Sequence, residues 1–192
     1  MARSRANLVV ANRFVAVSER RSRKQREDLG RDFRFVWLSI LVSSSGDGMF
    51  VTAFPLLAAI LTRDPVLIAG ITISTRLPWL LFSIFTGAIA DRSDRRKLMI
   101  GADVARMVIV GALGAAILFD VVAIWQLYVC AFFLGICETM HVNAAQAFIP
   151  AIVKQDQLLP ANARFASAQI VSTQFIGPPL GVAMFNVAHS LP

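Results

Sequence analysis

The chain of 192 residues is 56% hydrophobic and only 16% charged, with a mean hydropathy of +0.63. A soluble domain of this length usually carries more charge and fewer apolar residues, so the composition indicates an integral membrane protein. The formal net charge is +7, and much of the basic excess lies at the start of the chain, where residues 1–34 hold ten Lys and Arg against four acids.

The basic segment, residues 1–34, is interpreted as a cytoplasmic tail in front of a membrane domain at residues 35–192. It is too long and polar for the charged part of a signal peptide, so the first apolar run is expected to stay as an anchor. Nucleic-acid binding is the alternative for such a tail. We expect no nucleic-acid partner, because the tail has no recognisable motif and only two aromatic residues, Phe14 and Phe33. Contact with the lipid surface, or setting of topology, explains the charge better.

Five apolar runs in the chain are long enough to cross a bilayer, which takes about 20 residues. Because backbone groups in lipid must be hydrogen-bonded within one segment, each run is predicted to be a helix. Short links make neighbouring helices antiparallel. The sequence therefore predicts an all-α integral membrane protein with about five spans, at residues 35–61, 66–90, 98–119, 121–153 and 162–188.

The Lys and Arg residues of the links predict the orientation. The tail, the link after the second run and the link after the fourth run fall on one side. That side has Arg92, Arg95, Arg96, Lys97 and Lys154, whereas the other side has only Arg63. We therefore expect a multi-pass protein of the cell membrane with a cytoplasmic N-terminus.

Two ionisable residues are predicted at mid-depth in the first two spans. Asp47 and Arg76 lie roughly 18 and 15 Å into their runs at the helical rise of about 1.5 Å per residue. A charge at that depth is costly, so each is a candidate for function. A pair between Asp47 and Arg76 is expected. Either it fixes the structure only, or it takes part in proton or substrate handling.

A second group of charges is predicted nearer the cytoplasmic side. Asp103 and Arg106 stand three residues apart on the third span, and Glu138 lies in the fourth. All three are expected within reach of Arg95 and Arg96. The group is either a charge network with a functional role or an ion lattice that fixes helix packing.

Other reactive side chains give no sign of catalysis. Only Cys137 stands at ligand spacing from His141, so His141 is interpreted as a pore or interface residue and no metal is expected. The two cysteines, Cys130 and Cys137, are too far apart for a disulfide bond. Without a nucleophile–base set or a phosphate loop, we expect neither an enzyme nor a cofactor.

Small residues at four-residue spacing predict close helix packing in the fifth span, at Gly177 and Gly181. Pro178 and Pro179 lie between them. Because proline lacks the N–H group and its ring clashes with the preceding turn, a kink is expected there.

The link between the second and third spans resembles the signature of the major facilitator superfamily, and in particular of its drug:proton antiporter-like bacterial members. That signature reads Gly, three residues, Asp, Arg or Lys, one residue, Gly, and two further Arg or Lys. Asp94 stands where the family has its second glycine, and Asp tolerates tight turns well. The matching residues are Gly87, Asp91, Arg92, Arg95 and Arg96.

Further positions extend the resemblance over about residues 33–192. Asp47 followed by residues 53–55 (Ala-Phe-Pro) is similar to the family's first span. Gly177, Pro178 and Gly181 match the antiporter motif of the fifth span in part. The arginine common in the fourth span is missing, and Glu138 is the nearby charge instead.

The resemblance implies half of a twelve-span carrier that works by alternating access. This chain would then be an incomplete six-helix half-bundle, to be completed by a missing C-terminal half. The resemblance also implies efflux of small amphipathic compounds driven by protons. In the family the charged hairpin acts as a latch, so Asp91 is expected to meet helix ends of the other half. Arg95 is expected to meet an acid of the fourth span, for which Glu138 is the candidate. The alternatives are a truncated, non-transporting fragment and a small oligomeric scaffold or half-carrier.

Overall fold

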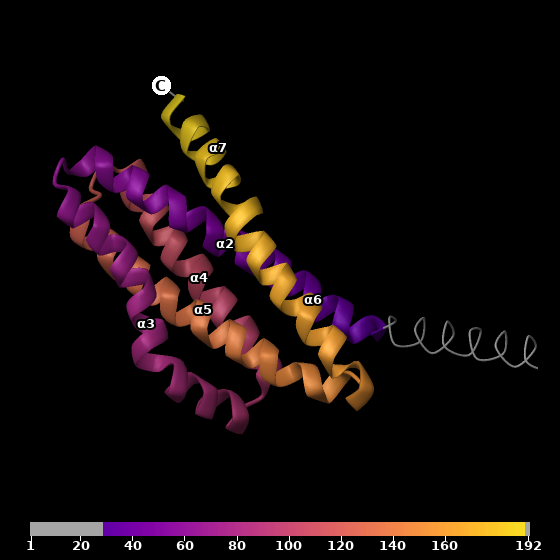
Figure 1. Ribbon diagram of the computed structural model, residues 1–192. Helices are drawn as coiled ribbons and strands as arrows, with labels where there is room; N and C mark the ends of the chain where they lie inside the picture. The colour runs from indigo at the N-terminus through magenta and orange to yellow at the C-terminus, as the bar shows by residue number, and fades with distance from the viewer. Residues whose placement is uncertain (1–28, 191–192) are drawn as a thin grey trace, which may run out of the picture.

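The computed structural model describes the backbone of residues 29–190 and their side chains, except those of residues 83–84, 86–92 and 187–190. Most of the predicted basic tail, residues 1–28, therefore lies outside the described part. Within it, the chain forms helices joined by short links (Figure 1). The prediction of an all-α membrane protein is confirmed.

Four of the helices are long and apolar enough to cross a membrane within the described residues. The first begins at Gly30, inside the segment predicted as tail. These helices are α2 (Gly30–Leu61), α3 (Pro65–Arg92), α4 (Arg95–Leu118) and α5 (Ile124–Ile152).

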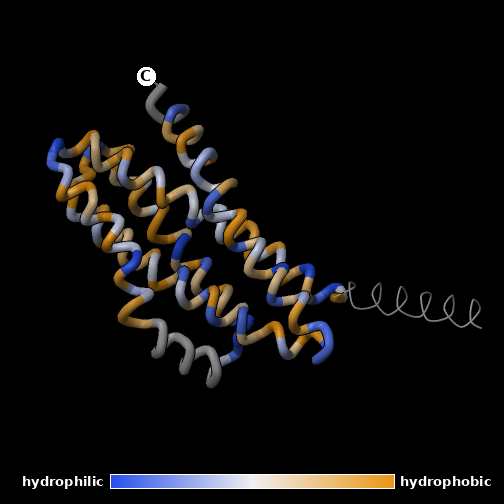
Figure 2. Tube along the Cα trace, in the orientation of Figure 1, coloured by the Kyte–Doolittle hydropathy of each residue, from blue (hydrophilic) through white to orange (hydrophobic). Residues whose placement is uncertain are grey.

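The fifth predicted span lies in three consecutive helical pieces, none of which reaches membrane length alone. A 3₁₀ turn, η1 (Gln155–Gln157), leads into α6 (Leu158–Val171), a π-helical segment η2 (Ser172–Ile176) and α7 (Gly177–Ser190). The three pieces follow one line beside α2 (Figure 1). Hydrophobic residues cover most of the length of the helices, and polar residues gather near their ends and at a few central positions (Figure 2).

The start of α4 shows why the charged link turns without the family's second glycine. Asp94 is the N-cap residue, with φ −64° and ψ 105°, a conformation open to any residue. Its carboxylate accepts hydrogen bonds from the backbone N–H groups of Arg96 (3.1 Å) and Lys97 (3.3 Å). These bonds satisfy donors that have no partner within the helix. Asp94 thus caps the helix with its side chain, whereas a glycine at this position would provide only backbone conformational freedom.

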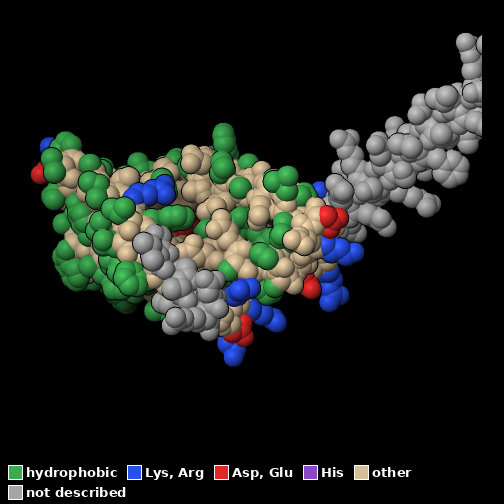
Figure 3. All heavy atoms as spheres, turned by 60° about the horizontal axis from the view of Figure 1, so that its bottom comes forward, with side chains coloured by type: hydrophobic (Ala, Val, Ile, Leu, Met, Phe, Trp, Pro, Cys, Tyr) green, Lys and Arg blue, Asp and Glu red, His purple; other side chains and the backbone are tan. Residues whose placement is uncertain are grey.

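Two apolar clusters hold the helices together, one near each end of the bundle. The first lies at the end that carries the α3–α4 and α5–α6 links and includes Phe33, Ile40 and Phe165. The second lies toward the opposite end and includes Phe54, Leu113 and Leu127. Basic side chains gather at the end with the first cluster (Figure 3).

Helices α2 and α7 cross with their backbones almost in contact. A Cβ atom added to Gly177 would lie 2.4 Å from the Cα of Gly48, and one added to Gly181 would lie 2.6 Å from the carbonyl oxygen of Met49. Real Cβ atoms do not come so close to backbone atoms. The four-residue spacing of Gly177 and Gly181 therefore places both glycines on the face of α7 that meets α2.

The π-helical segment η2 lies directly before Pro178 and Pro179. A proline ring clashes with the carbonyl group four residues earlier and cannot donate to it. Those carbonyls belong to Gln174 and Phe175, both inside η2. The wider π turn is the local solution to this conflict, at the place where the sequence predicts a kink.

The crossing of α2 and α7 predicts that Gly177→Ala lowers thermal stability in detergent or lipid, because the added methyl group must push two backbones apart. The cost should be about 1–3 kcal/mol. Gly114→Ala is the matched control, since a Cβ there meets no atom within 4 Å. Equal melting temperatures for the two variants would contradict the close crossing.

Candidate functional site

A buried ion pair joins the middle of α2 to the middle of α4. Nη2 of Arg106 lies 3.2 Å from Oδ2 of Asp47. Only 9% of the Arg106 side chain and 10% of the Asp47 side chain are exposed. Both residues are therefore held away from solvent, where an unpaired charge would be costly.

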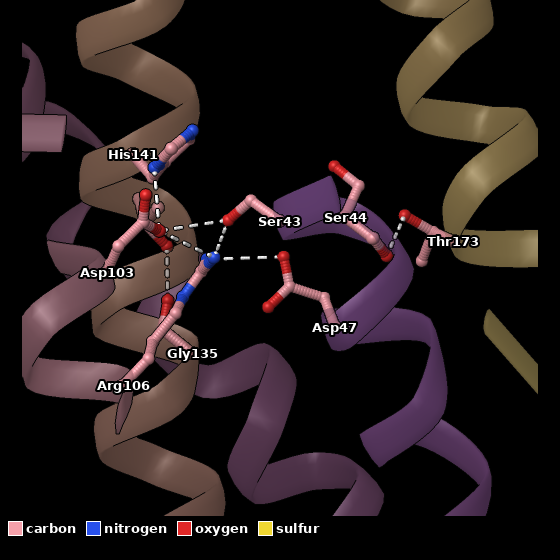
Figure 4. Close-up of polar contacts among 9 residues, drawn as sticks. Ser43, Ser44, Asp47, Asp103, Arg106, Gly135, His141 and Thr173 are labelled. Carbon is pink, nitrogen blue, oxygen red and sulfur yellow. Dashed lines mark hydrogen bonds and ion pairs between the residues drawn. The ribbon is translucent and has the colours of Figure 1, made fainter. Parts of the chain in front are cut away.

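The second carboxylate of the site, Asp103, uses one oxygen for three contacts (Figure 4). Its Oδ1 accepts a hydrogen bond from the hydroxyl of Ser43 at 3.1 Å and lies 3.5 Å from Nη1 of Arg106. The same oxygen lies 3.1 Å from Nδ1 of His141 on α5. Arg106 also donates a hydrogen bond to the Ser43 hydroxyl. We call these five residues, Ser43, Asp47, Asp103, Arg106 and His141, the polar network.

The polar network lies between the two apolar clusters. On α2, Asp47 stands between Ile40 of the first cluster and Phe54 of the second. On α4, Arg106 precedes Leu113 of the second cluster by two helical turns. Apolar packing above and below therefore limits the contact of Asp47 and Arg106 with water, which strengthens their mutual attraction. In contrast, 41% of the Asp103 side chain is exposed toward the grooves.

Asp47 borders a cavity on each of two sides of α2. One is a groove of about 620 Å³ between α2 and α4, which Asp103 and Arg106 also line. The other is a cavity of about 20 Å³ bounded by α2, α3, α5 and η2, with Arg76 and Glu138 in its walls. A space of that size has room for about one water molecule. Asp47 is thus a buried carboxylate that borders a space the size of one water molecule.

The predicted pair of Asp47 with Arg76 is wrong. Among the described ion pairs, Asp47 contacts Arg106, whereas Arg76 lines the small cavity together with Glu138. Asp47 and Arg76 do line the same small cavity, so the predicted depths agree, but the two side chains form no ion pair among those described.

The predicted contact of Arg95 with Glu138 is also wrong within the described residues. Glu138 stands at the centre of α5, fourteen residues before Ile152, which is roughly 21 Å along the helix axis. Arg95 begins α4 at the bundle end. Glu138 is instead half-buried in the wall of the small cavity. Asp103 and Arg106 likewise meet Ser43, Asp47 and His141 rather than the hairpin.

The charged hairpin is described only in part. The backbone of α3 is helical through Arg92, but the side chains of Gly87, Asp91 and Arg92 lie outside the described residues. Arg96 is exposed and lines a groove of about 630 Å³ between α2 and α4 that reaches down to Asp103.

Sequence reasoning missed the roles of Ser43 and His141. His141 is buried, with 1% of its side chain exposed. Its position three residues after Glu138 was the available signal, since two ionisable groups one turn apart mark a polar helix face. The described residues contain no group of three or more His, Cys, Asp or Glu arranged to hold a metal ion.

Comparison with known proteins places the chain in a family. The model of the family described as transmembrane secretion effector matches residues 30–191. Macrolide efflux protein A of Enterococcus faecalis is 27% identical over 111 residues, which cover 58% of this chain and 34% of that protein. The Streptococcus pyogenes protein of the same name is 27% identical over 111 residues, 58% of this chain and 27% of that protein.

An uncharacterized MFS-type transporter of Mycobacterium tuberculosis is 28% identical over 142 residues, or 71% of this chain and 31% of that transporter. This chain thus spans about a third of the length of the curated relatives that it matches. No solved structure matches it. The apolar helices and the family match together make it a multi-pass membrane protein. The resemblance seen in the sequence is confirmed, and the chain belongs to the transmembrane secretion effector family of major facilitator superfamily transporters.

Proposed function

We propose that the chain is the amino-terminal part of a secondary transporter of the cell membrane that exports small amphipathic compounds in exchange for protons. The observation that carries the proposal is the buried pair of Asp47 and Arg106 between two cavities. A charged pair at this depth is rare without a role in transport or proton transfer.

Asp47 is the member of the pair that can change its charge. Arg106 stays protonated in proteins, whereas a carboxylate can take up a proton. Protonation of Asp47 would remove the attraction between α2 and α4 at this point. Arg106 would then remain paired with Asp103, which lies on the same helix, α4. A proton on Asp47 would therefore loosen α2 from α4, and such a change can shift the balance between two conformations.

The surroundings of the pair support proton access. The small cavity beside Asp47 can hold about one water molecule and is also bordered by Glu138 and Arg76. Water in that cavity would connect the Asp47 carboxylate to a second carboxylate on α5. The membrane potential acts on each charge that crosses by about 2.3 kcal/mol per 100 mV, enough to bias states a few kcal/mol apart.

The walls of the groove of about 620 Å³ between α2 and α4 favour an amphipathic substrate. Phe50, Met107 and Val110 provide apolar contact, and Asp103 and Arg106 provide charge. The name of the related macrolide efflux proteins supports export of compounds with this character. We propose no narrower substrate. This chain covers about a third of its relatives' length, so residues elsewhere in the carrier would line most of the binding cavity.

The charged hairpin is proposed to act as the gate between conformations. Only Ser93 and Asp94 separate α3 from α4, and Asp94 caps the second helix. Such a short link makes the two helix ends move together. We propose that Asp91, Arg92, Arg95 and Arg96 contact the other half of the carrier in one of its states. An alternative is that this chain alone, at about a third of its relatives' length, does not transport.

The orientation is proposed from the distribution of basic residues. The links at the α3–α4 and α5–α6 end carry Arg95, Arg96, Lys97 and Lys154, whereas the other end carries Arg63. Positive residues are retained on the cytoplasmic side. The N-terminus is therefore proposed to be cytoplasmic.

Asp47→Asn is predicted to abolish proton-driven efflux, because the amide cannot carry the proton. The assay follows transport of the macrolide erythromycin into everted membrane vesicles that carry the full-length gene product and an imposed proton gradient. Asp47→Glu should keep part of the activity. Asp120→Asn is the matched control, since Asp120 is exposed in the α4–α5 link and its φ of 56° suits Asn. Undiminished, gradient-driven transport by Asp47→Asn would argue against the proposal.

Cysteine labelling is predicted to report the orientation. In a background with Cys130 and Cys137 replaced by Ala, Val121→Cys should react with a membrane-impermeant maleimide on intact cells. Ser93→Cys, in the α3–α4 link, should react only after the membrane is opened. The reverse pattern would place the N-terminus outside.

A further inference from the structure

A groove of about 720 Å³ lies between the beginning of α2 and α6. The two helices are in contact, and both start at the bundle end that carries the α3–α4 and α5–α6 links (Figure 1). The indole N–H of Trp37 joins them by donating a hydrogen bond to the backbone carbonyl of Arg164 at 3.3 Å. No residue of the polar network lines this groove.

The groove between α2 and α6 is positively charged. Arg34 and Arg164 line it, both are exposed, and no acidic side chain belongs to its described walls. The groove of about 630 Å³ between α2 and α4 differs, because its walls include the carboxylates of Asp32 and Asp103 beside two arginines. An anion is therefore attracted to the α2–α6 groove more than to the other one.

Charged and apolar surfaces are separated along the α2–α6 groove in the direction of the helix axes. Arg34 lies roughly 6 Å from the start of α2, and Arg164 lies roughly 9 Å from the start of α6, at about 1.5 Å per residue. Leu41 and Val171 line the groove roughly 10 Å further along the same two helices. The groove thus has a basic end and an apolar interior.

The basic end of the groove lies at the level of lipid headgroups. The 32 residues of α2 extend over about 48 Å, whereas the hydrocarbon of a bilayer is roughly 30 Å thick. The first turns of α2 therefore reach beyond the hydrocarbon, where a guanidinium group avoids the cost of burial in lipid. Trp37 stands one turn deeper than Arg34, and tryptophan is enriched at this boundary.

We propose that this groove binds an anionic phospholipid, with the phosphate at the end lined by Arg34 and Arg164. The acyl chain then runs along Trp37, Leu41 and Val171. A guanidinium group presents five N–H donors in a fork that matches a phosphate. The volume of the groove lies in the range of ligand sites, about 300–1,000 Å³. The proposal goes beyond the proposed function, because it requires only the membrane and holds whichever compound or ion is transported.

A lipid suits these walls better than a further helix of the carrier. A helix packed over the groove would cover two exposed guanidinium groups, and each would need an acid from that helix to offset its loss of water. A lipid leaves both charges at the water boundary and brings its own phosphate. The cytoplasmic leaflet is also negatively charged, which fits the proposed orientation.

Quenching of Trp37 fluorescence by lipids with brominated acyl chains tests the proposal. The chain has three tryptophans, so Trp79→Phe with Trp125→Phe leaves Trp37 as the only one. The full chain is placed in phosphatidylcholine nanodiscs that contain a small fraction of brominated lipid. Brominated phosphatidylglycerol should quench Trp37 at a lower mole fraction than brominated phosphatidylcholine. Each arginine should contribute roughly fivefold to this preference, the equivalent of about 1 kcal/mol.

Charge variants show whether the two arginines cause the preference. Arg34→Gln with Arg164→Gln should remove it, whereas Arg34→Lys with Arg164→Lys should keep most of it, because lysine retains the charge. Arg63→Gln is the matched control, since Arg63 is exposed at the other end of the bundle. Should the glutamine variant not fold, 1 M salt must reduce the preference in the chain with both arginines, because it shortens the Debye length to about 3 Å.

Three outcomes would overturn the proposal. The first is equal quenching by the two lipids, which would make the groove an unselective boundary with the bilayer. The second is a preference that survives the glutamine variant. The third is loss of the preference in the full-length gene product with its other tryptophans replaced, which would mean that another segment of the carrier covers the groove.

Discussion

The pairing of Asp47 with Arg106 is the interaction on which the rest of the structure depends. Each charge alone in hydrocarbon would cost several kcal/mol, and their contact at 3.2 Å offsets that cost. The pair also bridges two helices that have grooves of about 620 and 630 Å³ between them. Arg106 and its hydrogen bond to Ser43 therefore provide much of what connects α2 to α4.

Helix α2 is held in two different ways. On one side the backbone of Gly48 contacts that of Gly177, and this contact contains no ionisable group. On the other side the connection to α4 runs through ionisable groups. A proton can weaken the second connection and leaves the first intact. The proposed cycle follows from this difference: α2 stays attached to α7 and changes its position relative to α4.

The polar network also explains why the bundle has two apolar clusters and not one. The first cluster contains Ile40 and the second contains Phe54, with Asp47 between them on the same helix. Charged groups at this depth interrupt apolar packing and must be satisfied by one another. Ser43 contributes by bonding to both Arg106 and Asp103 with a single hydroxyl.

The sequence was sufficient to predict the four long helices, their approximate ends and the charges near the helix centres. Length and hydropathy determine these properties, because a span must cover a fixed thickness of lipid. The partners of the charges could not be predicted. Asp47 was matched with Arg76 by depth alone, but each residue turns a helix by about 100°, so a partner also depends on how each helix is rotated in the bundle. That rotation follows from contacts distant in the sequence, such as the crossing at Gly177.

His141 illustrates the same limit. Its position one turn after Glu138 marks a polar helix face but does not identify the side chain that it meets. That side chain is Asp103, which lies 38 residues earlier in the chain and one helix away. The turn at Asp94, in contrast, could be predicted from the residue type alone, because aspartate tolerates tight turns and is a good helix cap.

A double-mutant cycle of Asp47→Asn and Arg106→Gln tests the central pair most directly, with the free energy of unfolding in detergent as the readout. Arg106→Gln alone should cost roughly 3–5 kcal/mol, because it leaves Asp47 buried without its partner. The double variant, with both charges removed, should be more stable than Arg106→Gln. Additive losses would contradict the account, because they would mean that Asp47 and Arg106 contribute to the fold independently.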